Sequence, residues 1–233
     1  MMILYYHKLK VQKMKKNIAL IIFTLILISG LNAQKYQSSS SGTGWYAGVN
    51  AGVNLFVSEN YAAYLLDISK MPKAIGNNIG LTVGYDFSSV WGARAVFTNQ
   101  NFNWPFDSQL TIKSFASPQL IFDAVLNLNN ALKFNFLNGN SDILLYAGAG
   151  GFYRPLFGTL PPVTSYVLQG GGQFNFHVDT NWDITLAGEI NATDDRLNSI
   201  AVDGVPLDLF PAVKIGFIYH LDGGGNKKCM CYY

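Results

Sequence analysis

Apolar residues recur at every second position along most of the chain between residues 44 and 221. Between residues 182 and 191 the even positions are apolar apart from a glycine, whereas Asp183, Thr185 and Glu189 occupy odd positions. Strict alternation predicts a β-strand, because successive side chains of a strand point to opposite faces. Eight such stretches lie at residues 45–57, 77–87, 91–98, 115–128, 142–154, 164–178, 182–191 and 211–221.

The connections between these stretches alternate in length. Residues 88–90 and 179–181 form tight turns, and residues 129–142 form a link that is longer than a turn. The long connections cover residues 58–76, 101–113, 155–163 and 193–208. This alternation predicts an all-β fold, an eight-stranded antiparallel up-and-down barrel with its long loops at one end.

One face of every predicted strand is free of charge, and the charged residues fall on the other face. They are Asp86, Arg94, Asp123, Asp183, Glu189 and Lys214. These residues would coat a water-facing exterior only sparsely. If they point into the lumen, the apolar face meets lipid, where a basic residue at mid-bilayer would cost about 2 to 4 kcal/mol. We therefore expect residues 44–221 to form a transmembrane β-barrel.

Aromatic residues gather where the strands meet the short turns. They are Trp45, Tyr85, Phe87, Trp91, Trp182 and Tyr219. Barrels that span membranes carry aromatic girdles at the two interfaces. We interpret this set as one such girdle.

Composition excludes several other classes of protein. Only 13% of the residues are charged and 49% are hydrophobic, which is the opposite of a disordered chain. The 16 Lys and Arg residues barely outnumber the 14 Asp and Glu residues, so we expect no nucleic acid partner.

The N-terminal segment has the pattern of an export signal. Lys15 and Lys16 precede an apolar run over residues 18–28, and Ala33 offers a small residue before a cleavage site. A retained helix would need about 20 apolar residues. We predict a signal peptide over residues 1–33, of which residues 1–13 precede a second start at Met14, and a spacer over residues 34–43.

The segment "KIGFIYHL" near the end of the chain places Lys214, Gly216, Tyr219 and Leu221 at the offsets of a barrel-assembly signal. With the export signal and the eight alternating stretches, residues 44–221 resemble the small outer-membrane β-barrels similar to the N-terminal domain of outer-membrane protein A. The resemblance implies Sec export to the outer membrane of a Gram-negative-type cell, with outer-membrane lipid and the barrel-assembly machinery as partners. The chain departs from the pattern because Leu221 is not aromatic and a tail over residues 222–233 follows it.

The charged lumen residues are the first candidate site. If the last two strands pair symmetrically around their loop, Glu189 and Lys214 fall nearly opposite each other, and Arg94 sits within reach of Asp86 or Asp123. Eight strands enclose a space that side chains can just fill, so we expect these residues to form ion pairs that plug the lumen. The alternative is a set of separate charges, each solvated by lumenal water.

Two further groups suggest metal chemistry only weakly. His177 and His220 face inward near the periplasmic mouth, but two histidines without a third ligand make a poor metal site. Cys229 and Cys231 offer soft ligands, although a flexible tail is the simpler interpretation. We expect neither a metal nor a cofactor, and the absence of nucleophile and phosphate-binding motifs predicts that the protein is not an enzyme.

The sequence therefore predicts an outer-membrane barrel with a structural or membrane-integrity role and at most weak permeability to small solutes. One alternative is a narrow porin, or an adhesin that binds a surface ligand through loops 58–76 and 101–113. Aromatic residues in those loops are Tyr61, Tyr64, Phe102, Trp104 and Phe106. The other alternative is a soluble, exported, lipocalin-like ligand-binding barrel.

Overall fold

The computed structural model describes residues 43–55, 75–105, 112–133, 140–156, 161–194 and 207–221. The predicted signal peptide, the spacer up to residue 42 and the tail over residues 222–233 lie outside the described residues, as do the centres of the long loops.

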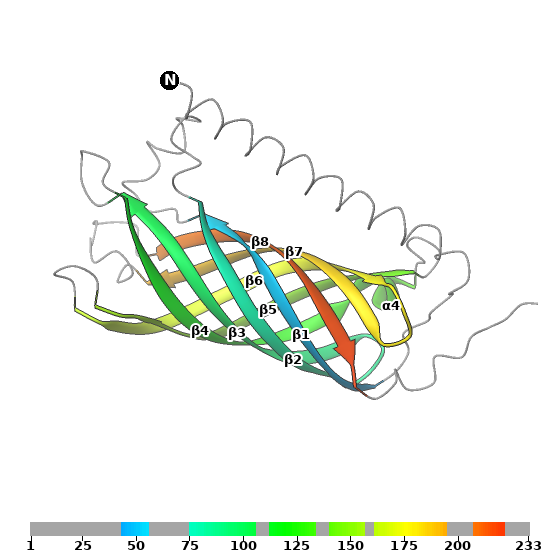
Figure 1. Ribbon diagram of the computed structural model, residues 1–233. Coiled ribbons are helices and arrows are strands. Elements are labelled where there is room, and N and C mark those ends of the chain that lie inside the picture. The colour runs from blue at the N-terminus through cyan, green and yellow to red at the C-terminus, as the bar shows by residue number, and fades with distance from the viewer. Residues whose placement is uncertain are drawn as a thin grey trace, which may run out of the picture. The chain divides into compact units, whose positions relative to one another are not determined.

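Eight antiparallel strands form a closed barrel in which each strand pairs with the next along the chain (Figure 1). The last strand pairs with the first over nine residue pairs, from Tyr46 opposite His220 to Asn54 opposite Ala212, and this seam closes the barrel. The strands are β1 (Gly44–Leu55), β2 (Ile75–Asp86), β3 (Trp91–Pro105), β4 (Ile112–Asn127), β5 (Ser141–Arg154), β6 (Val163–His177), β7 (Trp182–Asp194) and β8 (Leu207–His220). The predicted up-and-down topology is confirmed.

The two ends of the barrel differ in their connections. The turn end carries the short connections at residues 87–90 and 178–181, the link from β4 to β5, and both ends of the barrel sequence. The other end, the loop end, carries the four long connections. Two loops are shorter than predicted. The loop predicted over residues 101–113 shortens because β3 ends at Pro105 and β4 begins at Ile112. The loop predicted over residues 193–208 shortens because β7 ends at Asp194 and β8 begins at Leu207. Inward-facing Phe102 and Phe210 interrupt the apolar and polar alternation there, although the strand ladder continues.

The link from β4 to β5 contains a short helix, α4 (Leu128–Leu132), which explains why it is longer than a turn. The side chain of Asn127 caps the helix by accepting a hydrogen bond from the backbone N–H of Asn130 at 3.1 Å. Asn129 then ties the helix to β5, donating from Nδ2 to the carbonyl of Ser141 at 2.7 Å and accepting from the N–H of Ile143 at 3.2 Å.

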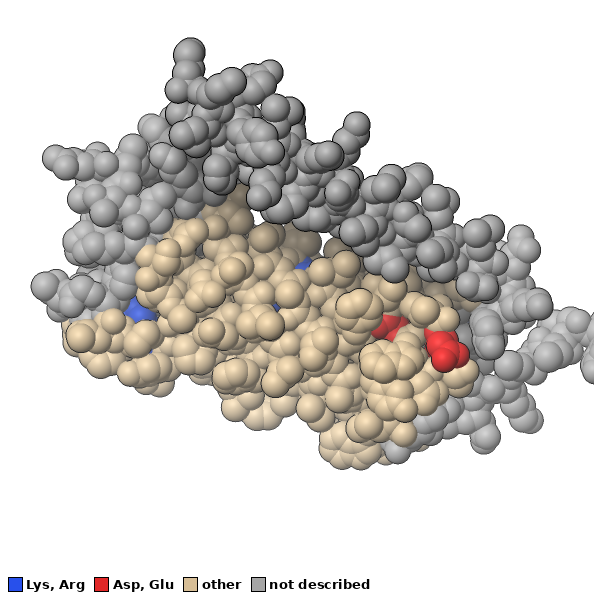
Figure 2. All heavy atoms as spheres, viewed as in Figure 1, with Lys and Arg blue, Asp and Glu red and all other residues tan. Residues whose placement is uncertain are grey.

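The barrel is apolar outside and polar inside. Leu81, Phe122 and Ile190 are 56%, 62% and 60% exposed, whereas Arg94, Asp123 and Lys214 are all at most 7% exposed. Figure 2 shows one face of the molecule, on which the described residues are almost all uncharged and acidic groups are visible only toward the turn end. A continuous apolar surface of this extent is far larger than the patches on soluble monomers.

No helix in the described ranges is both long enough and apolar enough to cross a membrane.

Glycines on the inner face make room for large side chains from neighbouring strands. A Cβ atom added to Gly84 would lie 2.2 Å from Cζ of Tyr46, and one added to Gly171 would lie 2.7 Å from Cζ of Tyr146. The two tyrosine rings therefore lie across the backbone of the adjacent strands, where any larger residue would displace them. This pairing of a large residue with a glycine fills the lumen without forcing the strands apart.

Candidate functional site in the barrel lumen

The candidate site is a layer of polar side chains across the middle of the lumen. Its charged members come from four strands: Arg94 from β3, Asp123 from β4, Glu189 from β7 and Lys214 from β8. Each lies at an inward position of its strand and is at most 7% exposed. These inward orientations follow from the alternation of apolar and polar residues along each strand. The closure of the barrel then brings the four strands around one space.

Arg94 forms the contacts in the half of this layer that lies next to β3 and β4. Its Nε donates to Oδ2 of Asp123 at 2.8 Å, and Asp123 is its direct partner across the β3–β4 ladder. Its Nη1 crosses the lumen and donates to Oε1 of Gln173 at 2.7 Å. The guanidinium carbon also lies 3.9 Å from the ring centre of Tyr146, within the range of a cation–π contact. The sequence analysis named Asp86 and Asp123 as possible partners of Arg94. In the structure Arg94 forms an ion pair with Asp123 and none with Asp86.

Glu189 forms the contacts in the half that lies next to β7 and β8. Its Oε1 lies 2.6 Å from Nζ of Lys214 and accepts from Nδ2 of Asn191 at 3.1 Å. Its Oε2 accepts from Nε2 of Gln169 at 2.9 Å and from the hydroxyl of Tyr146 at 3.2 Å. Glu189 thus has four hydrogen-bonding partners, which offsets much of the cost of removing its charge from water.

Tyr146 joins the two halves, because its ring contacts Arg94 and its hydroxyl contacts Glu189. The result is a chain of contacts that crosses the lumen from β3 and β4 to β7 and β8. Beside it remains a cavity of about 30 Å³, bordered by Asn50, Thr82 and Thr185 among other residues. Such a volume holds roughly two water molecules.

A second layer of side chains crosses the lumen toward the loop end. Asn54 donates to Gln100 at 2.7 Å, and Gln100 donates to Gln119 at 3.2 Å. Beyond them, the ring of Phe102 packs against Phe115 at 5.4 Å and against Phe210 at 5.3 Å, measured between ring centres. These stacked layers fill the lumen with side chains.

The prediction that Phe102 is a loop residue available to a surface ligand is wrong. Phe102 lies in β3 and is 0% exposed, because its inward position directs it into the lumen. Trp104 also lies in β3. Tyr61, Tyr64 and Phe106 are outside the described residues, so that part of the surface-binding alternative stays a prediction.

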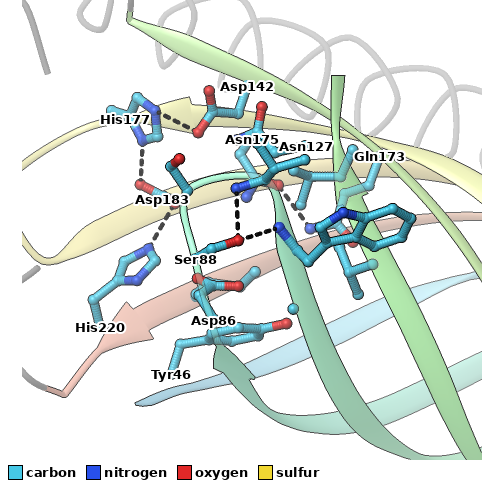
Figure 3. Close-up of a pocket in the computed structure, with 17 residues that line it drawn as sticks. Tyr46, Asp86, Ser88, Asn127, Asp142, Gln173, Asn175, His177, Asp183 and His220 are labelled. Atoms are coloured by element: carbon cyan, nitrogen blue, oxygen red, sulfur yellow. Dashed lines mark hydrogen bonds and ion pairs between the residues drawn. The ribbon is translucent and has the colours of Figure 1, made fainter. Parts of the chain in front are cut away.

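The turn end of the lumen opens into a vestibule, a cavity of about 60 Å³ (Figure 3). Two histidines and two carboxylates form a chain along its wall. His177 Nδ1 lies 2.7 Å from Oδ1 of Asp183, and His220 Nε2 lies 2.9 Å from Oδ2 of the same carboxylate. His177 Nε2 lies 3.4 Å from Oδ2 of Asp142. This chain links β5, β6, β7 and β8 at their turn ends.

Sequence reasoning placed His177 and His220 at this mouth but did not find their carboxylate partners. The sequence pattern identified Asp183 as an inward residue. Asp183 is the second residue of β7 and lies opposite His177 in the strand ladder. Asp142 could be found only from the register of β5 against β6. Among the described residues, no group of three or more His, Cys, Asp or Glu side chains is arranged to hold a metal ion.

The predicted aromatic residues form clusters at the turn end. Ring centres of Trp45 and Tyr85 are 5.0 Å apart, and those of Tyr85 and Phe87 are 5.6 Å apart. Trp182 and Tyr219 approach to 4.8 Å. Trp91 belongs to the same outward set and is 54% exposed.

The residues of the predicted assembly signal divide between the two faces of β8. Lys214 and Gly216 point inward, whereas Leu221, which directly follows the strand, is exposed and donates its N–H to the carbonyl of Trp45 at 2.9 Å. Tyr219 is half-buried against Trp182. Cys229 and Cys231 lie outside the described residues.

Comparison with known proteins finds likeness at the level of structure. No family model matches the chain, and no curated protein matches it in sequence. The structure is similar to neisserial surface protein A, with a TM-score of 0.54 and 15% sequence identity over 76% of this chain and 96% of that one. The search also finds the N-terminal β-barrel domain of Pseudomonas aeruginosa OprF (TM-score 0.40, 9% identity, 76% of this chain and 99% of that one). A further match is Ail, the attachment invasion locus protein of Yersinia pestis (TM-score 0.43, 16% identity, 77% and 99%).

The closed barrel of eight antiparallel strands, apolar outside and polar inside, is therefore the fold of the small outer-membrane β-barrels.

Proposed function

We propose that this protein is an outer-membrane β-barrel with a structural, membrane-integrity role and a lumen closed to ions. Sec export, insertion by the barrel-assembly machinery and contact with outer-membrane lipid are parts of the same proposal. The observation that carries it is the chain of contacts from Asp123 through Arg94, Tyr146 and Glu189 to Lys214, inside a barrel whose exterior is apolar.

The exterior supports membrane insertion. Ladder hydrogen bonds satisfy the backbone around the whole circumference, which a structure in hydrocarbon requires. The strands have 12 to 16 residues, enough to cross a bilayer at a tilt, since about 9 to 11 residues suffice. The same exterior argues against the soluble, lipocalin-like alternative, which needs its polar side chains outside and its apolar ones inside.

The lumen supports a closed barrel over a porin. A pore needs a continuous aqueous path, whereas here an ion-pair layer and an aromatic layer lie in series between the two ends. Breaking the ion-pair layer also leaves charges without partners in a space of low dielectric, so the layer resists opening. A role in catalysis is not part of the proposal.

Cell fractionation tests the location. The protein is expected in the outer-membrane fraction and in a form that migrates differently on gels before and after boiling, as a closed barrel does. Recovery in the aqueous fraction after lysis would reject the membrane proposal and restore the soluble alternative.

Conductance in planar lipid bilayers tests the closed lumen. The native protein is expected to give no steady channel, whereas the double variant Arg94→Ala, Glu189→Ala should conduct, because it removes the centres of both halves of the layer. Leu168→Ala, a lipid-facing change of β6, is the matched control and should stay closed. A steady open channel in the native protein would support the narrow-porin alternative instead. Heat-modifiable migration of each variant verifies that it is folded before it is scored.

A further inference from the structure

The outer face of β2 and β3 carries a polar patch within the apolar surface. Asn77 of β2 lies directly opposite Asn101 of β3, and Asn99 occupies the preceding outward position of β3. Asn77 is exposed, and Asn99 and Asn101 are half-buried. Along β2, Ile75 and Ile79 lie on either side of Asn77 and are 41% and 64% exposed. The three asparagines, here named the amide patch, therefore interrupt a surface that is apolar on both sides of Asn77.

The amide patch lies at the depth of the hydrocarbon. Leu81, in the middle of β2, is four positions from Asn77. A strand rises about 3.3 Å per residue, so at a tilt of about 40° four residues climb about 10 Å. The apolar band of an outer-membrane barrel is about 25 Å tall, so its edge lies about 12 Å from its middle. Water and lipid headgroups lie beyond that edge, and hydrocarbon chains are the only lipid groups at the level of Asn77.

The amide patch satisfies only part of its own hydrogen-bonding capacity. Nδ2 of Asn101 donates to Oδ1 of Asn77 at 2.7 Å, and the three side chains make no other hydrogen bond among the described residues. Nδ2 of Asn77 remains as a donor, Oδ1 of Asn101 remains as an acceptor, and the amide of Asn99 offers both. Polar groups left without partners in hydrocarbon are costly. A polar partner at the same depth is therefore favoured.

We propose that a second copy of this chain covers the amide patch, so that the protein is a dimer in the membrane. The patch is complementary to itself. Under two-fold symmetry about the membrane normal, Nδ2 of Asn77 in one copy meets Oδ1 of Asn101 in the other, and the same contact repeats in the opposite sense. The patch carries no charge, so two copies approach without repulsion. Ala116, opposite Asn101 on β4, is small and allows the two surfaces to come close.

Cross-linking in lipid vesicles tests the dimer, which rests on the proposed location in the membrane. In a background with Cys229→Ser and Cys231→Ser, a single cysteine replaces either Ile79, beside the amide patch, or Leu168, a lipid-facing residue of β6 that is 49% exposed. A large excess of lipid makes random encounters contribute equally at the two positions. The disulfide between two copies is expected to form about tenfold faster at position 79, which is in the range that a few interchain hydrogen bonds in a membrane provide.

Substitution of the patch tests its role. The combined change Asn77→Leu, Asn99→Leu, Asn101→Leu should abolish the preference for position 79, because it replaces the amides with apolar groups of similar shape. Thr164→Leu, which removes an exposed hydroxyl from β6, is the matched control and should retain the preference. Heat-modifiable migration verifies that each variant is folded.

Two results would overturn the dimer alone: equal rates at positions 79 and 168 in folded, membrane-inserted protein, or a preference that survives the triple substitution. Recovery of the native protein in the aqueous fraction would instead reject the membrane location, and the dimer with it.

Discussion

Lys214 on β8 and Glu189 on β7 form an ion pair with 2.6 Å between Nζ and Oε1, although they are not direct partners in the strand ladder. Lys214 lies opposite Ala187, and Glu189 lies opposite Ala212. The two long side chains therefore meet diagonally over two alanines, whose small size leaves the space between the charged groups free. Diagonal neighbours in a sheet are within reach of long side chains.

The first prediction concerns this pair. Lys214→Met removes the cation and leaves the carboxylate of Glu189 buried, which should lower the free energy of unfolding by about 3 to 5 kcal/mol. Urea denaturation of the protein in lipid vesicles, followed by its shift on unboiled gels, measures the effect.

The matched control replaces both charges. Lys214→Met combined with Glu189→Leu should recover most of the lost stability, because two apolar groups of similar size often replace a buried ion pair without loss. If the single variant is as stable as the native barrel, the pair does not contribute as its geometry suggests.

The second prediction concerns Asp183, which receives hydrogen bonds from two histidines on different strands. Asp183→Asn replaces one accepting carboxylate oxygen with an amide N–H and removes the negative charge that lies next to both histidines. The expected cost is about 1 to 3 kcal/mol of unfolding free energy, measured by the same denaturation assay.

Asp179 provides the comparison for Asp183, because it lies in the neighbouring turn and is exposed. Asp179→Asn should change the stability by less than about 0.5 kcal/mol. Equal changes in unfolding free energy for the two substitutions would show that the burial of Asp183 does not increase its contribution to stability.

The third prediction concerns glycines on the two faces of the barrel. Gly84→Ala would place a methyl group against the ring of Tyr46, so it should destabilise the barrel by about 1 to 3 kcal/mol. Gly188→Ala, on the outer face of β7, meets no atom within 4 Å and should be neutral or slightly stabilising. Thermal unfolding in detergent compares the two variants.

A rescue experiment identifies the cause of the Gly84 effect. If the clash with the ring is responsible, Tyr46→Ala should make the further change Gly84→Ala nearly neutral. The explanation fails if Gly84→Ala costs the same in the presence and in the absence of the tyrosine ring.

The fourth prediction concerns the lipid-facing surface. Leu81 lies in the middle of β2, with Val49 and Phe97 as its neighbours on the adjoining strands. Leu81→Arg should cost about 2 to 4 kcal/mol in a bilayer, because it places a charge near the midplane. Folding titrations into lipid vesicles measure this cost.

Leu207 begins β8 at the loop end and is also exposed, at 40%. Leu207→Arg should cost only about 0 to 1 kcal/mol, as expected near an interface. A larger cost at Leu207 than at Leu81 would contradict the proposed position of the barrel in the membrane.

The sequence by itself determined which way the side chains of each strand point. Arg94, Glu189 and Lys214 were assigned to the inner face from alternation alone, and the structure buries all three. This information is local, because the two faces of a strand follow from its geometry whatever the strand pairs with. The same local rule gave the number of strands and the position of the aromatic clusters at the turn end.

Only the tertiary structure decided which inward residues meet. Asp86 and Asp123 were both candidates for Arg94, and the strand register places Asp123 directly opposite it, whereas Asp86 lies opposite Gly92. Contacts across the lumen, such as that between Arg94 and Gln173, depend on the diameter of the closed barrel and on the stagger of its strands. For a related reason, the sequence pattern did not predict the full length of β3 and β8. Near the loop end Phe102 and Phe210 take inward positions, so apolar residues no longer mark only the outer face, although both strands continue.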